Sequence, residues 1–538
     1  MAKINFNIYY ALVVFIIACG SIPKGYDEGG FAAVSKLDSF KRDFGLKSAQ
    51  WKGPHSELLW LRSLVNSLGV LGAAAGAVIA IAITDRIGRL RAWQIFAVVW
   101  MTGFFATTFA SGYVALLLVA RIWGGLGAGG LTVVAPLYLT EISRTSTRGM
   151  IVSVYMVILL TFLMIGFFIN YAAVRTMAST REQYRLVLAV PQIPVGLTLI
   201  ASFFLHDTPR WLASKNRGKE ALEALARLRG SSADDVEVLK EFDEMQKRID
   251  DENQMLADAS TWTIAKEVAT IPSYRRRFLL GVLMQTVAQW SGGNGITYYI
   301  TDVFQLAGIK SERGSLVSAG SYGATKLIFT VVFTWGLIDY FGRRRCFMAG
   351  LSLQFATHVY MAVYMAIWGD DDNQAASKAA VASVFVYAIG WSIGLCTVQY
   401  LYGTEILPTR VRGVCYATNM TIHWLYQFAV VCVTPAMFAH LDIWGAYAFY
   451  ATICAIGLVV LGLWAPETKG VPMERMADLF TGPWYMGWRA KVDAYSDDGS
   501  SQGHSSPEVG EKAASSVGSR QGKGGLEKSG GVMALQYA

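Results

Sequence analysis

The hydrophobic positions of this chain form long apolar stretches that are separated by shorter polar segments. A helix needs roughly 20 apolar residues to cross the hydrocarbon core of a bilayer. Twelve stretches approach this length, near residues 8–30, 59–83, 92–110, 113–140, 149–172, 186–205, 279–304, 315–338, 346–368, 378–404, 414–437 and 443–464. The first, seventh and tenth contain the most polar residues. The pattern predicts an all-α membrane protein with twelve transmembrane helices.

Charged residues repeat in the same order in the two halves of the chain. A glycine flanked by charged residues occurs in Asp85–Arg91 and again, about half the chain later, in Asp339–Arg345. A glutamate is followed seven residues later by an arginine at Glu141 and Arg148, and again at Glu405 and Arg412. The repetition indicates two six-helix bundles related by pseudo-symmetry. Such internal repeats are typical of proteins that alternate access to a central site.

The composition of the chain favours a lipid environment. The 538 residues are 53% hydrophobic and 16% charged, with a mean hydropathy of +0.37, whereas soluble proteins carry about 25% charged residues. The net charge of +8 does not indicate nucleic-acid binding, because basic residues gather in alternate short loops: Arg86, Arg89, Arg91, Arg144, Arg148, Arg343, Arg344, Arg345, Arg410 and Arg412. Basic short loops mark the cytoplasmic side. Both termini are therefore expected in the cytoplasm, and residues 35–56 outside, although that segment contains four lysines.

Polar segments divide the chain into four predicted regions. These are an N-terminal six-helix bundle over 1–205, a cytoplasmic helical linker over 206–277, a C-terminal six-helix bundle over 278–465 and a cytoplasmic tail over 466–538. In the linker, leucines recur at helical spacing among charged residues, which predicts amphipathic helices over Lys219–Leu228 and Ala233–Met255. From about Ala494 the tail is rich in Ser, Gly, Lys and Glu and is expected to be disordered.

A glycine-rich stretch and six cysteines have structural interpretations. Gly125, Gly127 and Gly130 match a dinucleotide-binding pattern, but they lie inside one long apolar stretch. Close helix packing is the better interpretation. The cysteines all fall in or beside apolar stretches, where they are expected to be small buried side chains without disulfides. No set of residues suggests a nucleophile with its base, a metal site or a cofactor, so the sequence does not predict an enzyme.

Several short motifs, in their order and spacing, resemble those of the sugar porter family of the major facilitator superfamily. They are Gly25–Asp27, Asp85–Arg91, Arg121, Pro136–Glu141, Arg148, Gly149, Pro209–Leu212, Gln289, Gly292, Asn294, Tyr298, Tyr299 and Pro466–Gly470. The resemblance covers the chain except for its tail. It implies alternating access, a central site for a monosaccharide-sized molecule, location in the plasma membrane and action as a monomer.

The chain departs from the family pattern at positions that the resemblance places around the substrate. The glutamine of the fifth helix is replaced by Met156, and the first of two glutamines on the seventh is Ala288. The proline-containing stretch of the tenth helix reads Cys396–Tyr400, and two asparagines of the eleventh become His423 and Gln427. These departures leave the particular substrate open.

Asp27 is the predicted proton carrier. A carboxylate inside a membrane is costly and is usually functional. The resemblance places Arg121 where proton symporters of the family pair an arginine with this aspartate. Protonation of Asp27 would release it from Arg121 and allow the first helix to move. A permanent ion pair that only stabilises the bundle is the alternative.

The charged repeats are predicted to form a cytoplasmic gate. Its candidate residues are Asp85, Arg89, Glu141, Arg148, Asp339, Arg343, Glu405 and Arg412. Their ion pairs would form in one state of the transport cycle and break in the other. The alternative is that these arginines only set the orientation of the helices. Glu467 is a further candidate.

The predicted substrate site combines polar groups with flat aromatic faces. Its candidate residues are Gln289, Asn294, Tyr298, Tyr299, Lys326, Tyr400, His423, Trp424 and Gln427. Gln289 and Asn294 supply hydrogen-bond donors and acceptors together, while the aromatic rings can stack on sugar rings. Core packing is the default interpretation for any one aromatic side chain, and a structural role is the default for His423.

Lys326 is an unusual cation in the eighth apolar stretch, where a buried charge needs a partner of opposite sign. A lysine here resembles quinate permeases and some fungal-type symporters of sugars and sugar acids. One hypothesis is that Lys326 binds the carboxylate of a substrate such as quinate or galacturonate. The alternative is that it reaches water or an internal partner.

The main functional prediction is a proton-coupled symporter that imports a monosaccharide or related sugar. A permease for sugar acids and a nutrient sensor that binds its ligand without transport are the alternatives. The expected partners are a small sugar or sugar acid, protons and the lipid bilayer.

Overall fold

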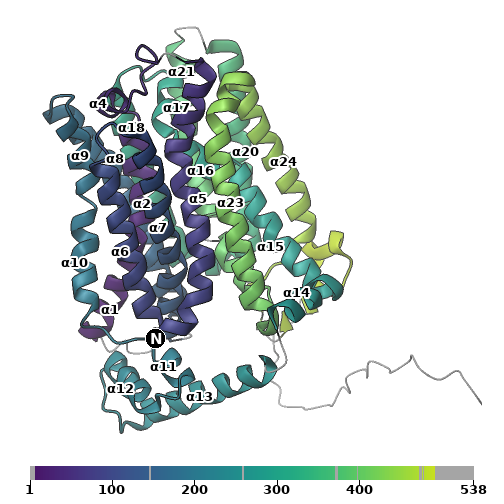
Figure 1. Ribbon diagram of the computed structural model, residues 1–538. Coiled ribbons are helices and arrows are strands. Elements are labelled where there is room, and N and C mark those ends of the chain that lie inside the picture. Colours follow the sequence, from purple (N-terminus) through teal and green to yellow (C-terminus); the bar gives the residue numbers. More distant parts are fainter. Residues whose placement is uncertain are drawn as a thin grey trace, which may run out of the picture. The chain divides into compact units, whose positions relative to one another are not determined.

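The computed structural model describes residues 7–51, 53–144, 147–256, 260–369, 373–396, 398–469, 471, 475–476 and 478–490. The secondary structure of this part of the chain is helical throughout, with turns and loops between the helices (Figure 1). Most of the helices run alongside one another in a bundle, and a group of shorter helices lies beyond one end of it.

The first half supplies six membrane-spanning segments. The first is continuous but changes its winding, through α1 (Ile8–Ala18), η1 (Cys19–Ser21), α2 (Ile22–Tyr26), η2 (Asp27–Phe31) and α3 (Ala32–Val34). After the short α4 (Asp38–Asp43) follow α5 (His55–Ile87), α6 (Arg89–Thr108), α7 (Val114–Ile142) and α8 (Arg148–Thr176). The sixth segment is divided into α9 (Arg181–Ala189) and α10 (Gln192–Ser202), on either side of Pro191, which cannot donate a backbone hydrogen bond.

The second half follows a connection of four helices, α11 (Pro209–Ser214), α12 (Gly218–Arg229), α13 (Val236–Leu256) and α14 (Thr261–Thr270). Its six spans are α15 (Pro272–Trp290) with α16 (Gly293–Tyr298) and α17 (Ile300–Leu306); α18 (Glu312–Val332) with η3 (Phe333–Leu337) and α19 (Ile338–Phe341); α20 (Arg343–Trp368); α21 (Gln374–Gly394) with α22 (Val398–Glu405); α23 (Thr409–His440); and α24 (Asp442–Trp464). Two short 3₁₀ turns, η5 (Asp478–Phe480) and η6 (Trp484–Arg489), come after them.

The twelve predicted spans therefore all coincide with helical segments. Within the described residues, ten helices have both the length and the hydropathy of a membrane span. The other two segments are α6 and the broken run α15–α17. The run breaks at Gly292, whose φ of 88° lies in the left-handed region that glycine adopts readily.

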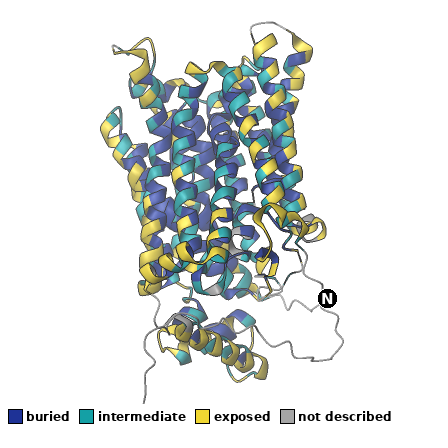
Figure 2. Ribbon diagram, turned by 90° about the vertical axis from the view of Figure 1, so that its right-hand side faces the viewer, coloured by how far each residue is buried: buried dark blue, intermediate teal, exposed yellow. Residues whose placement is uncertain are grey.

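Contacts between the two halves are made mainly by the second and fifth spans of each half. The second span, α5, packs along α23, and the fifth, α8, packs along α18. Within the first half, α7 lies between α5 and α6, and within the second half α20 packs on α21 and α24. Buried residues concentrate where these helices face one another, while exposed residues are frequent on the outer faces and on α12 and α13 (Figure 2).

The glycine-rich stretch of α7 is a packing surface, as predicted. A Cβ atom on Gly125 would lie 2.0 Å from the carbonyl oxygen of Gly69 on α5, and one on Gly129 would lie 2.0 Å from that of Ala73. A Cβ on Gly127 would lie 2.3 Å from the backbone nitrogen of Trp100 on α6. Only glycine permits backbones to approach this closely. The six cysteines are likewise buried and free of disulfides, as expected.

We call the end of the bundle where α5 joins α6 and α19 joins α20 the linker end, because α11–α13 lie next to it (Figure 1). Trp211 of α11 donates a hydrogen bond from its indole nitrogen to the carbonyl of Asp85, at 3.0 Å. Asn7, just before α1, donates to the carbonyls of Arg227 and Leu228 at 2.7 and 3.1 Å. These contacts attach the connecting helices to the first half.

Candidate functional site

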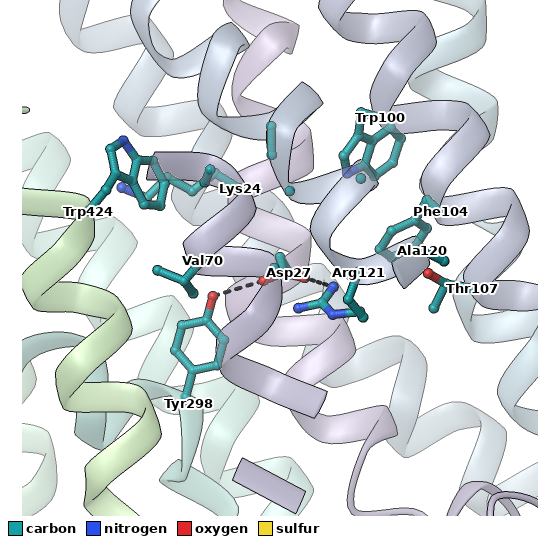
Figure 3. Close-up of a pocket in the computed structure, with 15 residues that line it drawn as sticks. Lys24, Asp27, Val70, Trp100, Phe104, Thr107, Ala120, Arg121, Tyr298 and Trp424 are labelled. Atoms are coloured by element: carbon teal, nitrogen blue, oxygen red, sulfur yellow. Dashed lines mark hydrogen bonds and ion pairs between the residues drawn. The ribbon is translucent and has the colours of Figure 1, made fainter. Parts of the chain in front are cut away.

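The centre of the site is Asp27, which lies in the π-helical turn η2 and forms an ion pair with Arg121 of α7 (Figure 3). Arg121 is only 3% exposed. Its Nε donates to the carbonyl of Val65 at 3.1 Å, and its guanidinium lies 3.7 Å from the ring centre of Phe31. The predicted pair is therefore present and is held by backbone and aromatic contacts as well as by charge.

Asp27 also connects the two halves of the protein. The hydroxyl of Tyr298, on α16 of the second half, donates a hydrogen bond to Oδ2 of Asp27 at 2.8 Å (Figure 3). A pocket at this point is lined by residues of both halves, among them Lys24, Asp27, Arg121, Tyr298 and Trp424. One carboxylate thus accepts hydrogen bonds from both sides of the interface between the halves.

The glycines of the first span allow it to pack closely against α8 around the π-helical turn. A Cβ on Gly25 would lie 2.1 Å from the carbonyl oxygen of Leu159, and one on Gly29 would lie 2.1 Å from that of Leu163, both on α8. Asn170 of α8 donates to the carbonyl of Gly30 at 3.0 Å. π-Helical turns are rare in proteins, and those that occur are often found at functional sites. Here the turn brings Asp27 towards α7 while its glycine face packs against α8.

Four polar candidates of the second half form one hydrogen-bonded cluster, namely Gln289, Asn294, Tyr400 and His423. Nε2 of Gln289 lies 3.1 Å from Nδ1 of His423, and Oε1 of Gln289 accepts from Asn294 at 3.1 Å. The hydroxyl of Tyr400 lies 3.2 Å from Nε2 of the same histidine. Gln285, which the sequence interpretation did not include, lies 2.8 Å from His423 Nδ1. It stands one helical turn before Gln289, a spacing that could have identified it.

Lys326 is buried within the second half, at 1% exposure. Its Nζ donates to Oγ1 of Thr297 at 3.1 Å and lies 3.8 Å from the ring centre of Trp391. Among the residues described, no carboxylate lies within ion-pair distance of it. Cation–π contact and one hydroxyl therefore replace the ionic partner that a buried lysine usually has.

Two further charges face the centre, and the sequence interpretation missed both. Lys24 lies one helical turn before Glu28, with Nζ and Oε1 4.0 Å apart, and both side chains are nearly buried. Lys24 Nζ is also 4.6 Å from the ring centre of Trp424, and Gln427 donates to Glu28 at 3.5 Å. The available signal was the presence of a lysine and a second carboxylate beside Asp27 in an apolar stretch.

Tyr299 has a different environment from its neighbour Tyr298. Its hydroxyl donates to the carbonyl of Val431 in the same half, at 3.0 Å. The Nζ of Lys36 lies 4.6 Å from its ring centre and forms an ion pair with Asp302. Tyr299 therefore packs against the Lys36–Asp302 ion pair between the halves. It does not belong to the hydrogen-bonded cluster around His423.

At the linker end of the first half, three of the predicted gate residues meet. Arg89 binds Glu141 through Nε and Nη2, at 3.1 and 2.9 Å from Oε1, and its Nη1 lies 2.8 Å from Asp85. Asp207 accepts hydrogen bonds from the backbone amides of Arg89 and Leu90 at 3.1 and 3.2 Å. Asp207 therefore caps the start of α6, a place where negative charge is favourable. Burial raises the pKa of Asp207, although these backbone hydrogen bonds act in the opposite direction.

The second half repeats this arrangement. Arg343 pairs with Glu405 at 3.2 Å, and Glu467 accepts from the backbone amides of Arg343 and Arg344 at 2.9 and 3.2 Å. Thr468 donates to Glu405 at 2.9 Å, as Thr208 donates to Glu141. The sequence interpretation gave Glu467 only a secondary place and did not include Asp207, because a cap far along the chain has no local spacing signal.

The other predicted gate residues lie outside these two clusters. Arg148 forms no ion pair with any residue that the structure describes, and Arg412 donates to the carbonyl of Leu407 at 3.1 Å. Arg148 and Arg412, from opposite halves, lie close enough for their charges to interact. The side chain of Asp339 is outside the described part of the structure, as is the tail from Ala494. The charged clusters are therefore separate in each half.

Twelve helices in two equivalent halves, with buried charges between them, define a multi-pass membrane transporter. The chain belongs to the family described as sugar (and other) transporter, whose model matches residues 13–480. It is 27% identical to the quinate permease of Neurospora africana over 492 residues, which is 89% of this chain and 90% of that protein. It is 29% identical to a probable quinate permease of Aspergillus niger over 485 residues, which is 88% of each chain.

Solved structures support the same fold. The proton:xylose symporter XylE bound to 6-bromo-6-deoxy-D-glucose superimposes with a TM-score of 0.72 at 21% identity, covering 88% of this chain and all of that one. An inward-open conformation of XylE from E. coli gives a TM-score of 0.70 at 20% identity over the same share of this chain. The fold is thus the twelve-helix, two-bundle fold of the major facilitator superfamily.

Proposed function

We propose that this protein is a proton-coupled symporter that imports a monosaccharide or related sugar by alternating access. The observation that carries the proposal is the position of Asp27, which pairs with Arg121 in its own half and accepts a hydrogen bond from Tyr298 in the other. Protonation removes the charge that holds Arg121 and weakens the hydrogen bond from Tyr298. The two halves are then free to separate at this point.

The substrate occupies the space beside this carboxylate. Gln289, Asn294 and His423 present a connected set of donors and acceptors that suits the hydroxyl groups of a sugar. Trp424 supplies a flat apolar face next to them. The naming of XylE as a proton:xylose symporter supports both the sugar and the proton.

The charged clusters at the linker end act as a gate in this proposal. The pair of Arg89 with Glu141 joins the ends of α6 and α7, and the pair of Arg343 with Glu405 joins the ends of α20 and α22. Rigid ends let each half move as a body. The linker end faces the cytoplasm, as its basic loops favour, and the protein acts as a monomer in the plasma membrane.

Uptake of labelled sugars by cells that lack their own carriers tests this function. Glucose, xylose and fructose are compared at pH 5 and pH 7.5, with and without a protonophore. Acid-stimulated uptake that the protonophore abolishes is the expected result. Uptake that is insensitive to both would make the protein a passive carrier, and absence of uptake by surface-localised protein would favour a sensor.

A sugar acid is the second candidate substrate, because Lys326 has a buried charge and no carboxylate within ion-pair distance in the described residues. The names of the curated relatives point the same way, since they are quinate permeases. Lys326→Ala should reduce uptake of quinate or galacturonate far more than uptake of a neutral sugar. The exposed Lys378→Ala is the matched control. Equal loss of both uptakes would count against carboxylate recognition.

A further inference from the structure

The region between the halves contains more charge than the Asp27–Arg121 pair accounts for. Lys24 and Glu28 enter from the first span, and Lys326 enters from α18. Glu28 is 4% exposed and Lys326 is 1% exposed. Glu28 lies 4.0 Å from Lys24 and also within electrostatic reach of Lys326. Glu28 is therefore the ion-pair partner of Lys24, whereas Lys326 of the second half acts on the same carboxylate from beyond ion-pair distance.

The charges in this group do not balance. With every side chain counted as ionised, Asp27 and Arg121 neutralise each other, whereas Lys24, Lys326 and Glu28 together leave one positive charge. An unbalanced charge is costly away from water, and charges interact strongly there. Aromatic rings reduce this cost in part, because Trp424 lies beside Lys24 and Trp391 beside Lys326. A single negative charge from a ligand would complete the neutralisation.

Polar atoms beside these charges also lack partners. Oε1 of the fully buried Gln427 and Nε1 of Trp391 have no hydrogen-bond partner among the described residues. The amide nitrogen of the same Gln427 donates to Glu28. One acceptor and one donor therefore stand next to the two lysines, in positions to bind hydroxyl or carboxylate groups of a ligand.

We propose that Glu28 is the internal counter-ion of the substrate site and determines its charge selectivity. Its carboxylate shares Lys24 and Lys326 with the single carboxylate of a bound sugar acid. Glu28 thereby limits the site to one negative charge from the substrate. Lys24 is the second cation that binds this carboxylate. The inference rests on the proposed transport of a sugar or sugar acid through this site.

Binding of galactose and galacturonate to the purified full-length protein tests the inference, because the uronate adds one carboxylate to the hexose. Isothermal titration calorimetry compares the wild type with Glu28→Gln. The variant removes a negative charge beside two lysines, so it should bind galacturonate more tightly than the wild type does. We expect the affinity to rise at least about tenfold, which is the size of charge interactions at partly buried sites. Galactose affinity should change little. Asp38→Asn, a carboxylate-to-amide change at an exposed position outside the site, should alter neither.

A second variant keeps the test decisive if Glu28→Gln folds poorly. Lys24→Met/Glu28→Gln removes one charge of each sign, so the site again carries one positive charge, and Lys24 is not left without its partner Glu28. Its galacturonate affinity should return to near the wild-type value. Unchanged galacturonate affinity in Glu28→Gln, or no galacturonate binding by any of these proteins, overturns the inference.

Uptake measurements separate this inference from the proposed function. Proton-driven sugar uptake with no charge-dependent change in binding would overturn the role of Glu28 alone. Charge-dependent binding without proton-driven uptake would support the role of Glu28 and overturn symport.

Discussion

Tyr298 of the second half donates a hydrogen bond to Asp27 of the first half, with their oxygens 2.8 Å apart. Asp27 is at the same time the partner of Arg121. The same carboxylate therefore controls an interaction inside one half and an interaction between the halves. Any change in its charge acts on both at once.

We expect Tyr298→Phe to weaken the contact between the halves, since a hydrogen bond to a charged group contributes about 1.5–3 kcal/mol. The melting temperature of the purified protein should fall. In an Asp27→Asn background, the same substitution should have a clearly smaller effect, because its charged acceptor is gone. Tyr299→Phe is the control: its hydroxyl bonds to Val431 in its own half, so its effect should be independent of Asp27. Additive effects of Tyr298→Phe and Asp27→Asn would contradict the coupling.

Asp27→Asn should abolish accumulation of substrate against its gradient while leaving some exchange of labelled for unlabelled substrate. The amide keeps the size of the side chain but cannot carry a transported proton. The measurement is uptake into energised cells beside counterflow in vesicles without a proton gradient. Proton-driven accumulation at the wild-type level would show that Asp27 has only a structural role.

Gly88→Ala should destabilise the first half by more than about 1 kcal/mol, because alanine is strained at positive φ. Gly88 has a φ of 102°, and its Cβ would lie 2.2 Å from Oδ2 of Asp207. Gly342→Ala should destabilise the second half in the same way, because its Cβ would lie 2.5 Å from Oε2 of Glu467. Gly149→Ala is the matched control, since nothing lies within 4 Å of its Cβ. Thermal stability of the purified variants is the measurement, and equal stability of all three would contradict the capping roles.

Glu267→Gln should lower stability at neutral pH and have no effect at strongly acidic pH. A hydrogen bond from Arg410 lowers the pKa of Glu267, and the charge of Arg410 adds to it. A lowered pKa gives stability that is present above the unfolded-state value of about 4.3 and lost as the pH falls through the folded-state value. Melting temperatures of the variant and the wild type should therefore converge on acidification. A constant difference at all pH values would exclude this ion pair as the cause.

The sequence was sufficient for features that depend on local pattern. Apolar stretches predicted the twelve spans, and the glycine run predicted the close packing of α7. The repeated charges also placed Arg89, Glu141, Arg343 and Glu405 among the gate candidates, but the structure was needed to show which of them pair. Repetition supplied information that a single motif lacks.

Features that depend on contacts between distant residues were not readable in the same way. Asp207 caps a helix more than a hundred residues earlier in the chain, and only folding brings them together. Arg148 matches a family motif, yet no carboxylate pairs with it in the described part of the chain. Glu28 stood beside Asp27 in the sequence, but its proposed role depends on Lys326, almost three hundred residues away.

The π-helical turn at Asp27–Phe31 gives the first span a mechanical property. This turn holds one residue more than an α-helical turn. Rewinding it as an α-helix would rotate the preceding part of the span by about 100° relative to the part that follows, which is the angular step of one residue. Asp27 and Glu28 are themselves one such step apart. A change of winding, without unfolding, would therefore turn the residues before Asp27 relative to those after Phe31.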